Sequence, residues 1–125
     1  MAHMTRITPF ALTADLDAEI AFFTDILSSE CSYRADNYAF VRRDAVALRL
    51  IEVGPQIDLA DERRQNSCYI DVEGIDALYA ELKPKLAMLP PGRVRAPFDQ
   101  DYGQREFHVI DEGAMLIFFG EPVRA

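Results

Sequence analysis

The sequence carries one pattern of elements twice, and this repeat limits the folds open to the chain. Each copy reads as a strand, one amphipathic helix and three further strands, over residues 5–53 and again over residues 66–122. The two copies are weakly similar where each helix begins, at Asp15 to Ala21 and at Glu73 to Ala80. An internal repeat of this length indicates duplication of one supersecondary unit. We expect each unit to form an antiparallel four-stranded sheet with one helix on one face.

The two units are expected to form a single α+β domain over residues 5–122. The polar stretch 54–65, which contains the Gly54-Pro55 breaker, would be the crossover between them. Half of the chain is apolar, which is enough for one hydrophobic core at a length of 125 residues. Residues 1–4 read as an expression-tag remnant, so His3 is left out of the functional argument.

Apolar side chains recur at helical spacing in residues 16–27 and again in residues 75–86. Asp15 is the expected N-cap of the first helix. Pro84 is expected to end or kink the second helix near Lys83, because proline lacks the backbone donor that a helix needs.

Strand signals frame both helices. The first strand is predicted at residues 5–12, and Pro9 indicates an edge position because it cannot donate to a neighbouring strand. Near the C-terminus, Phe107 and Val109 alternate with polar residues, and a six-residue apolar run follows at 114–119. Asp111 to Gly113 lies between these stretches, and glycine tolerates the positive φ of many tight turns. We therefore predict a terminal hairpin.

The charge pattern argues against a nucleic-acid partner. The net charge is −8, with 5 basic and 9 acidic residues in 1–60 and 8 and 12 in 61–125, so the acidity is spread evenly. Binding to nucleic acid needs a basic face, whereas an acidic surface mildly favours a cationic ligand. No apolar run is long enough for a membrane span. Cys31 and Cys68 show no metal-type or redox spacing, which favours reduced thiols and a cytoplasmic location.

The chain resembles the vicinal oxygen chelate superfamily, and most closely its bleomycin-resistance-like, glyoxalase-fold branch. The resemblance covers most of the chain and is carried by three segments: Ala14 to Asp17 with Ala21 to Phe23; Asp71 to Leu82; and Tyr102 to Phe107 with Asp111 to Gly113. It implies two βαβββ repeats that form a half-barrel cup, completed in a homodimer.

The resemblance also indicates where enzymes of the superfamily hold a divalent metal. The matching positions fall near Thr8-Pro9, Asn66-Ser67 and Ile117, which are not ligands of the required kind. Glu52 is the one carboxylate near such a position. We therefore expect no metal and no other cofactor. His108 and Glu106 share one face of a strand, and a general-base role for this pair is a minor alternative.

The resemblance implies a ligand site lined by aromatic and acidic side chains. Tyr38 matches the aromatic residue of the third strand, with Phe40 two residues on, and Tyr102 matches the aromatic residue that opens the terminal hairpin. Rings of this kind stack on flat heteroaromatic ligands. The full candidate set is Tyr38, Phe40, Arg49, Glu52, Asp99, Asp101, Tyr102 and Phe107, with the acids placed to hold a cationic tail. For Phe40 and Phe107 the alternative is packing in the core, and for Tyr38 and Tyr102 it is packing or a hydrogen-bonded position at an interface.

The leading hypothesis is a metal-independent, homodimeric protein that binds and sequesters an antibiotic or another planar toxic compound without chemical change. The alternative is a lyase, isomerase or dioxygenase of the same superfamily with a non-standard metal site. A third hypothesis is an interaction module with no small ligand. The first two differ in one observable, the metal content of the purified protein.

Overall fold

The computed structural model describes residues 2–64 and 66–123; Met1 of the predicted tag remnant and Gln65 of the predicted crossover lie outside them. The elements of the first half are β1 (Phe10–Thr13), α1 (Leu16–Ala21), the π-helical segment η1 (Phe22–Ile26), β2 (Glu30–Arg34), β3 (Tyr38–Arg43) and β4 (Val46–Glu52). After the short 3-10 turn η2 (Glu62–Arg64), the second half continues with β5 (Ser67–Asp71), α2 (Ile75–Leu86), β6 (Val94–Asp99), β7 (Gln104–Ile110) and β8 (Leu116–Pro122).

Each half forms its own four-stranded sheet, in the order β1-β4-β3-β2 and β5-β8-β7-β6. This arrangement confirms the predicted α+β class with two βαβββ units in an open, cup-like fold. The expectation of purely antiparallel sheets is wrong, because β1 runs parallel to β4 and β5 parallel to β8. A helix separates the first two strands of each unit and two hairpins follow, so the last strand returns in the direction of the first.

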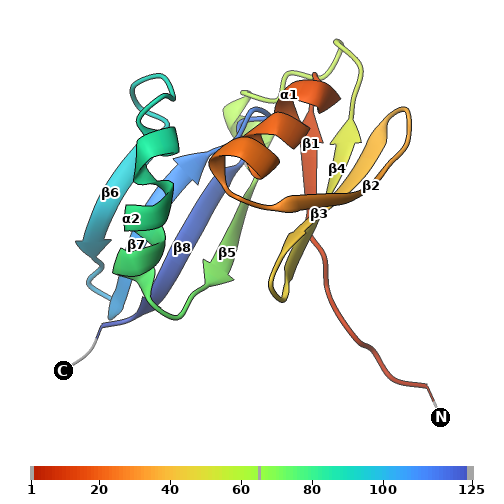
Figure 1. Ribbon diagram of the computed structural model, residues 1–125. Helices are drawn as coiled ribbons and strands as arrows, with labels where there is room; N and C mark the ends of the chain where they lie inside the picture. The colour runs from red at the N-terminus through yellow and green to blue at the C-terminus, as the bar shows by residue number, and fades with distance from the viewer. Residues whose placement is uncertain (1, 65, 124–125) are drawn as a thin grey trace.

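Strand β1 begins later than predicted but lies where its proline requires. The strand starts at Phe10 and occupies an edge of its sheet, next to β4. The carbonyl oxygen of Pro9 accepts a hydrogen bond from the Arg49 backbone N–H at 3.0 Å. Residues 2–7 are exposed and form a tail that leads away from the body of the molecule (Figure 1).

Both helices lie on the same side of the sheets, and the core fills the space beneath them (Figure 1). The buried positions of β3 alternate with exposed or half-buried ones, as the period of a strand demands, and β4 follows the same pattern from Leu48 to Ile51. The core includes Leu48 and Leu50 below α1, and Phe107 and Ile117 in the second half. The opposite face of each sheet has no helix over it, and we call it the open face.

The register of the strands fixes which side chains share each open face. On the first sheet they include Phe10, Tyr33, Tyr38, Phe40, Arg49 and Ile51. On the second sheet they include Tyr69, Arg95, Phe98, Glu106, His108 and Phe118.

At the start of each helix, backbone N–H groups donate to a glutamate carboxylate from the last strand of the same half. Asp15 is the N-cap of α1, as predicted, and accepts from the Ala18 N–H at 3.1 Å. The Glu52 carboxylate also accepts from the Leu16 N–H at 3.0 Å. At the start of α2, Glu121 accepts from the N–H groups of Gly74 and Ile75 at 3.1 and 3.0 Å. These bonds satisfy backbone donors that have no partner within the helix.

Two local predictions need correction. Of the two effects expected of Pro84, an end or a kink near Lys83, the first does not occur, because α2 runs on to Leu86 and both Leu82 and Leu86 bury their side chains in the core. In the terminal hairpin, Gly113 is not needed for its φ. A Cβ there would meet the Leu12 carbonyl oxygen at 1.7 Å, so glycine allows close packing between the two halves, and Ala114 carries the positive φ of 66°.

Candidate functional site

Three of the predicted residues come together on the open face of the first sheet. Arg49 donates from Nη1 to the Tyr38 hydroxyl at 2.6 Å and from Nε to the Thr8 hydroxyl at 2.8 Å. Its guanidinium lies over the Phe40 ring, 5.3 Å from the centroid. Arg49 therefore lies on the aromatic open face, with its cation over the Phe40 ring and hydrogen-bonded to the Tyr38 hydroxyl.

Tyr102 lies on the open side of the second sheet, in a cluster that the candidate set mostly omits. Its hydroxyl donates to Glu106 at 2.5 Å, and Gln100 Nε2 donates to the same carboxylate at 3.0 Å. His108 Nε2 lies 2.8 Å from Glu106 Oε1, so the expected pairing of these two side chains is present. The Tyr69 hydroxyl accepts from Gln104 at 2.9 Å beside this cluster.

The neighbours of Glu106 decide its charge. Burial raises the pKa of this carboxyl, but hydrogen bonds from Tyr102, His108, Gln100 and Tyr69 together hold the pKa below its ordinary value. The carboxylate in turn raises the pKa of the Tyr102 hydroxyl, mainly through their hydrogen bond. Burial first, and Glu106 second, raise the pKa of Tyr69 to about 12. The cluster is therefore an ionised carboxylate held by neutral hydroxyl groups at neutral pH.

Aromatic rings surround the cluster on the open face. The His108 ring lies 4.3 Å from Phe118 and 5.2 Å from Phe98, centroid to centroid. Tyr69 stacks on Phe118 at 5.9 Å, and the Arg95 guanidinium lies 3.6 Å from the Phe98 centroid. Both open faces therefore combine aromatic rings with a guanidinium group, that of Arg49 on the first sheet and that of Arg95 on the second.

The structure does not place Glu52 and Phe107 with the other candidates. Glu52 caps α1, on the side of the sheet that faces the helix. Phe107 is 0% exposed and packs between Tyr79 of α2 and Phe119. Both side chains lie on the helix-facing side of their strands, so neither lines a site on an open face.

The two acidic candidates near the terminal hairpin lie at its exposed end. Asp99 forms an ion pair with Arg105 at 3.1 Å, and Arg105 also pairs with Asp76 at 3.0 Å. Asp101 is exposed in the turn before Gly103, next to Tyr102. Of this pair, Asp101 is the acid adjacent in the chain to the Tyr102 ring.

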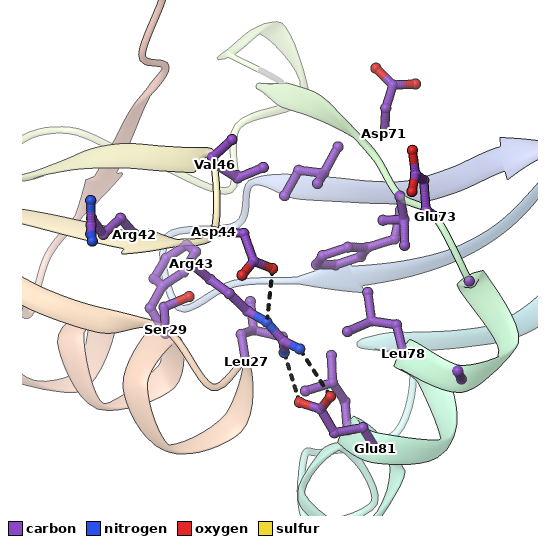
Figure 2. Close-up of a pocket in the computed structure, with 18 of the residues that line it drawn as sticks. Leu27, Ser29, Arg42, Arg43, Asp44, Val46, Asp71, Glu73, Leu78 and Glu81 are labelled. Carbon is purple, nitrogen blue, oxygen red and sulfur yellow. Dashed lines mark hydrogen bonds and ion pairs between the residues drawn. The ribbon is translucent and has the colours of Figure 1, made fainter.

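A groove of about 700 Å³ lies on the helix side of the molecule, away from both open faces. Its floor is apolar, with Phe23, Leu48 and Phe119 among the lining residues, and charged side chains form the rim. Figure 2 shows Arg43 reaching across it to Glu81, with Asp71 and Glu73 on the far side. None of the eight predicted site residues lines this groove.

The residues present do not fit the metal site of the superfamily enzymes. In residues 2–64 and 66–123, no group of three or more His, Cys, Asp or Glu side chains is placed to hold a metal ion. The Thr8 hydroxyl accepts a hydrogen bond from the Arg49 guanidinium, and Ile117 is fully buried.

Within residues 2–64 and 66–123, no helix is long and apolar enough to span a membrane.

Sequence reasoning missed Tyr69 and undervalued Glu106, although a signal was present. Tyr69 shares the alternation of Ser67 and Asp71, so it is a single aromatic residue on the polar side of its strand. A polar-side aromatic is not needed for the core and is therefore a candidate for binding. No such indication exists in the sequence for Phe118, because residues 114–119 are all apolar and no alternation shows which of them face the helix.

No family model matches the chain, but curated relatives do. The bleomycin resistance protein of Geobacillus stearothermophilus is 29% identical over an alignment of 138 residues, which covers 98% of this chain and 100% of that protein. A bleomycin resistance protein of Staphylococcus aureus matches to the same extent. The similarity therefore extends over both halves of the chain.

Solved structures match at full length as well. The bleomycin-binding protein of Streptomyces verticillus, complexed with copper(II)-bleomycin, superposes with a TM-score of 0.78 at 23% identity and full coverage of both chains. The bleomycin resistance determinant encoded on transposon Tn5 superposes with a TM-score of 0.80 at 19% identity, over 95% of this chain and 98% of that one. The chain has the vicinal oxygen chelate fold, as its resemblance predicted.

Proposed function

We propose that this chain, which has the vicinal oxygen chelate fold and resembles bleomycin resistance proteins over almost its whole length, binds and sequesters a small molecule without changing it. The observation that carries the proposal is the uncovered aromatic surface on both sheets. Tyr33 and Tyr102 are 58% and 63% exposed there, although the helix side of each sheet is closely packed. Exposed rings on a rigid sheet are suited to stacking on a planar ligand.

The ligand surface on the first sheet would be Tyr38, Phe40 and Arg49, whose guanidinium contacts both of these residues. On the second sheet it would be Tyr102, with Tyr69 beside it. The guanidinium of Arg49 suits a carbonyl or anionic group, whereas Asp101 suits a cationic tail. An antibiotic with flat rings and charged ends, such as bleomycin, combines these features.

We further propose that the protein acts as a homodimer. Phe10, Tyr33, Tyr69 and Tyr102 all keep more than a third of their surface exposed, and a monomer rarely leaves so many rings uncovered. The open faces of two copies would cover one another and leave the ligand between them, with twofold symmetry. A cytoplasmic location, expected from the unpaired Cys31 and Cys68, is part of the same proposal.

Thermal unfolding with bleomycin tests the proposal. Metal-free bleomycin at about 100 times its dissociation constant should add roughly 2.7 kcal/mol to the free energy of unfolding, a shift of several degrees. We expect the shift to persist in the presence of a chelator and to disappear in the Tyr38→Ala and Tyr102→Ala variants. Met88→Ala is the matched control, because Met88 is exposed after α2 and away from both open faces.

Two outcomes would count against sequestration by a dimer. Stabilisation by a divalent metal alone, with none from the drug, would favour the enzyme alternative. A monomer at micromolar concentration in light scattering would count against the proposed ligand site as well as against the dimer.

A further inference from the structure

A buried carboxylate lies beneath the exposed rings of the second sheet. Glu106 is 0% exposed although its strand position belongs to the open face. The side chains that cover it are Gln100 and Tyr102 from the turn before β7, and Tyr69 from β5. We call Glu106 and these three residues, together with His108, the Glu106 cluster.

Burial of an ionised carboxylate is costly unless hydrogen bonds replace its water. Glu106 meets this requirement with three donors from β7 and the turn before it: Tyr102 on Oε2, and Gln100 and His108 on Oε1. Hydrogen bonds to an ionised acceptor are shorter and stronger than those between neutral groups. The Tyr102 bond, at 2.5 Å, is the shortest of them.

The Tyr102 ring depends on this bond for its position. Tyr102 lies in a turn where Gly103 has a φ of 90°, and most of its side chain is exposed. Among the residues that the structure describes, no other ring contacts it. An exposed side chain without such packing samples several rotamers unless its polar end is fixed. The carboxylate of Glu106 provides the fixed point.

Tyr69 is positioned beside the same carboxylate by the absence of a side chain at Gly120 and by contacts with Gln104 and Phe118. A Cβ at Gly120 would lie 2.0 Å from the Tyr69 hydroxyl and 3.0 Å from Glu106 Cγ. Glycine at this position therefore makes the space in which the hydroxyl and the carboxylate meet. Gln104 donates to the hydroxyl, and the Tyr69 ring rests on Phe118.

We propose that Glu106 is the positioning residue of the ligand surface on the second sheet, where it fixes the Tyr102 ring, with the Tyr69 ring beside it, for stacking on a planar heteroaromatic group. The inference rests on the proposed function. Glu106 itself is covered and does not touch the ligand. It acts by ordering exposed rings before binding, which spares the entropy that a free side chain would lose on contact.

The first test needs no ligand. Tyrosinate absorbs in the near ultraviolet, so the ionisation of the five tyrosines can be followed directly as the pH rises. Glu106→Gln keeps the shape of the side chain but removes the negative charge that opposes ionisation of Tyr102 and Tyr69. We expect part of the high-pH ionisation to move to lower pH. Tyr102→Phe should instead delete one component of the same curve.

The second test is a double-mutant cycle on ligand affinity, measured by calorimetry with metal-free bleomycin. Glu106→Gln and Tyr102→Phe should each weaken binding by about tenfold, and the double variant by little more than either alone. Tyr33→Phe is the matched control, because Tyr33 is an exposed tyrosine on the other sheet. Its effect should add to that of Glu106→Gln without coupling.

The outcomes separate the two proposals. An unchanged tyrosine titration in folded Glu106→Gln overturns the positioning role, whether or not the drug binds. Additive effects of Glu106→Gln and Tyr102→Phe overturn it as well. If Glu106→Gln does not fold, Tyr102→Phe still tests the role, because it must weaken binding while it keeps the ring. If the wild-type protein binds no bleomycin, the proposed function fails, and with it the ligand role of the cluster.

Discussion

A pair of buried carboxyl groups, Glu19 and Asp111, lies where the two halves of the chain meet. Glu19 of α1 and Asp111, in the turn after β7, are 0% and 3% exposed, and each has one oxygen without a hydrogen-bond partner within the described residues. The other Asp111 oxygen accepts from the N–H groups of Gly113 and Met115, both at 2.8 Å. A proton shared between the two carboxyl groups would satisfy both remaining oxygens.

The pKa values of the pair agree with a shared proton. Burial, and then the charge of Asp111, raise the pKa of Glu19 to about 9. Burial also raises the pKa of Asp111, to about 6, against the hydrogen bonds from Met115 and Gly113. Glu112 and Arg93 also face the pair, and the Arg93 charge lowers the pKa of Asp111. Glu19 is therefore the member that stays protonated at neutral pH.

This pair should make stability fall as the pH rises. The folded state holds the Glu19 proton to about pH 9, whereas the unfolded chain releases it near the ordinary value of 4.5. The stabilising contribution is thus complete below about pH 4.5 and lost progressively toward pH 9. Glu19→Gln cannot ionise and still donates to Asp111, so at pH 8 we expect a gain of about 1–3 kcal/mol over the wild type. Urea unfolding across this pH range measures the change, and equal slopes in the two proteins would rule out the shared proton.

At the scale of elements, both helices have their first backbone N–H groups capped by a glutamate from the last strand of the same half. Glu52 at the end of β4 caps α1, and Glu121 near the end of β8 caps α2. The repeat that is weak in sequence is therefore clear in structure. It also gives Glu52 a structural role, whereas the ligand contact expected for it stays a prediction.

Replacement of Glu52 distinguishes the two roles. Glu52→Ala removes an acceptor for the Leu16 N–H, and loss of a helix cap costs about 0.5–2 kcal/mol. We expect a lower midpoint of chemical unfolding and an unchanged affinity of the folded protein for bleomycin. Asp15→Ala is the matched control for the loss of a cap at the same helix. A large loss of affinity in Glu52→Ala alone would return Glu52 to the ligand site.

Alternation along the strands made much of the fold predictable, but it did not show which side the helix covers. The pattern around Phe107 separates two faces of β7 correctly, yet aromatic character alone suggested a ligand role for that residue. Tyr79 of α2 packs on the Phe107 ring and assigns it to the core. Similarly, sequence alone does not show that the distant Gly120 makes room for Tyr69, because that contact depends on the pairing of β5 with β8.

For the molecule as a whole, one ion pair spans the groove between the two halves. Arg43 of β3 donates to both oxygens of Glu81 of α2, at 2.7 and 2.9 Å (Figure 2). Both side chains are partly exposed, so water and salt screen the pair. Its bidentate geometry is nevertheless the kind that retains a measurable contribution.

A cycle of neutral substitutions measures this contact between the halves. Arg43→Gln and Glu81→Gln should each lower stability slightly, and the double variant should show a coupling of about 0.5–1 kcal/mol. High salt should reduce the coupling, because the pair is partly exposed. Arg63 and Asp61, an ion pair within one exposed loop, provide a control in which the halves are not joined. Strictly additive effects would mean that the pair does not contribute to holding the halves together.

The capping glutamates have a consequence for how the native state opens. Because Glu52 and Glu121 each come from the last strand of the half that they cap, no helix is complete until its own sheet has formed. Each contiguous half should then behave as one cooperative opening unit, or foldon. Native-state hydrogen exchange would show this as two groups of amides, with the α1 amides exchanging together with β4 and the α2 amides with β8.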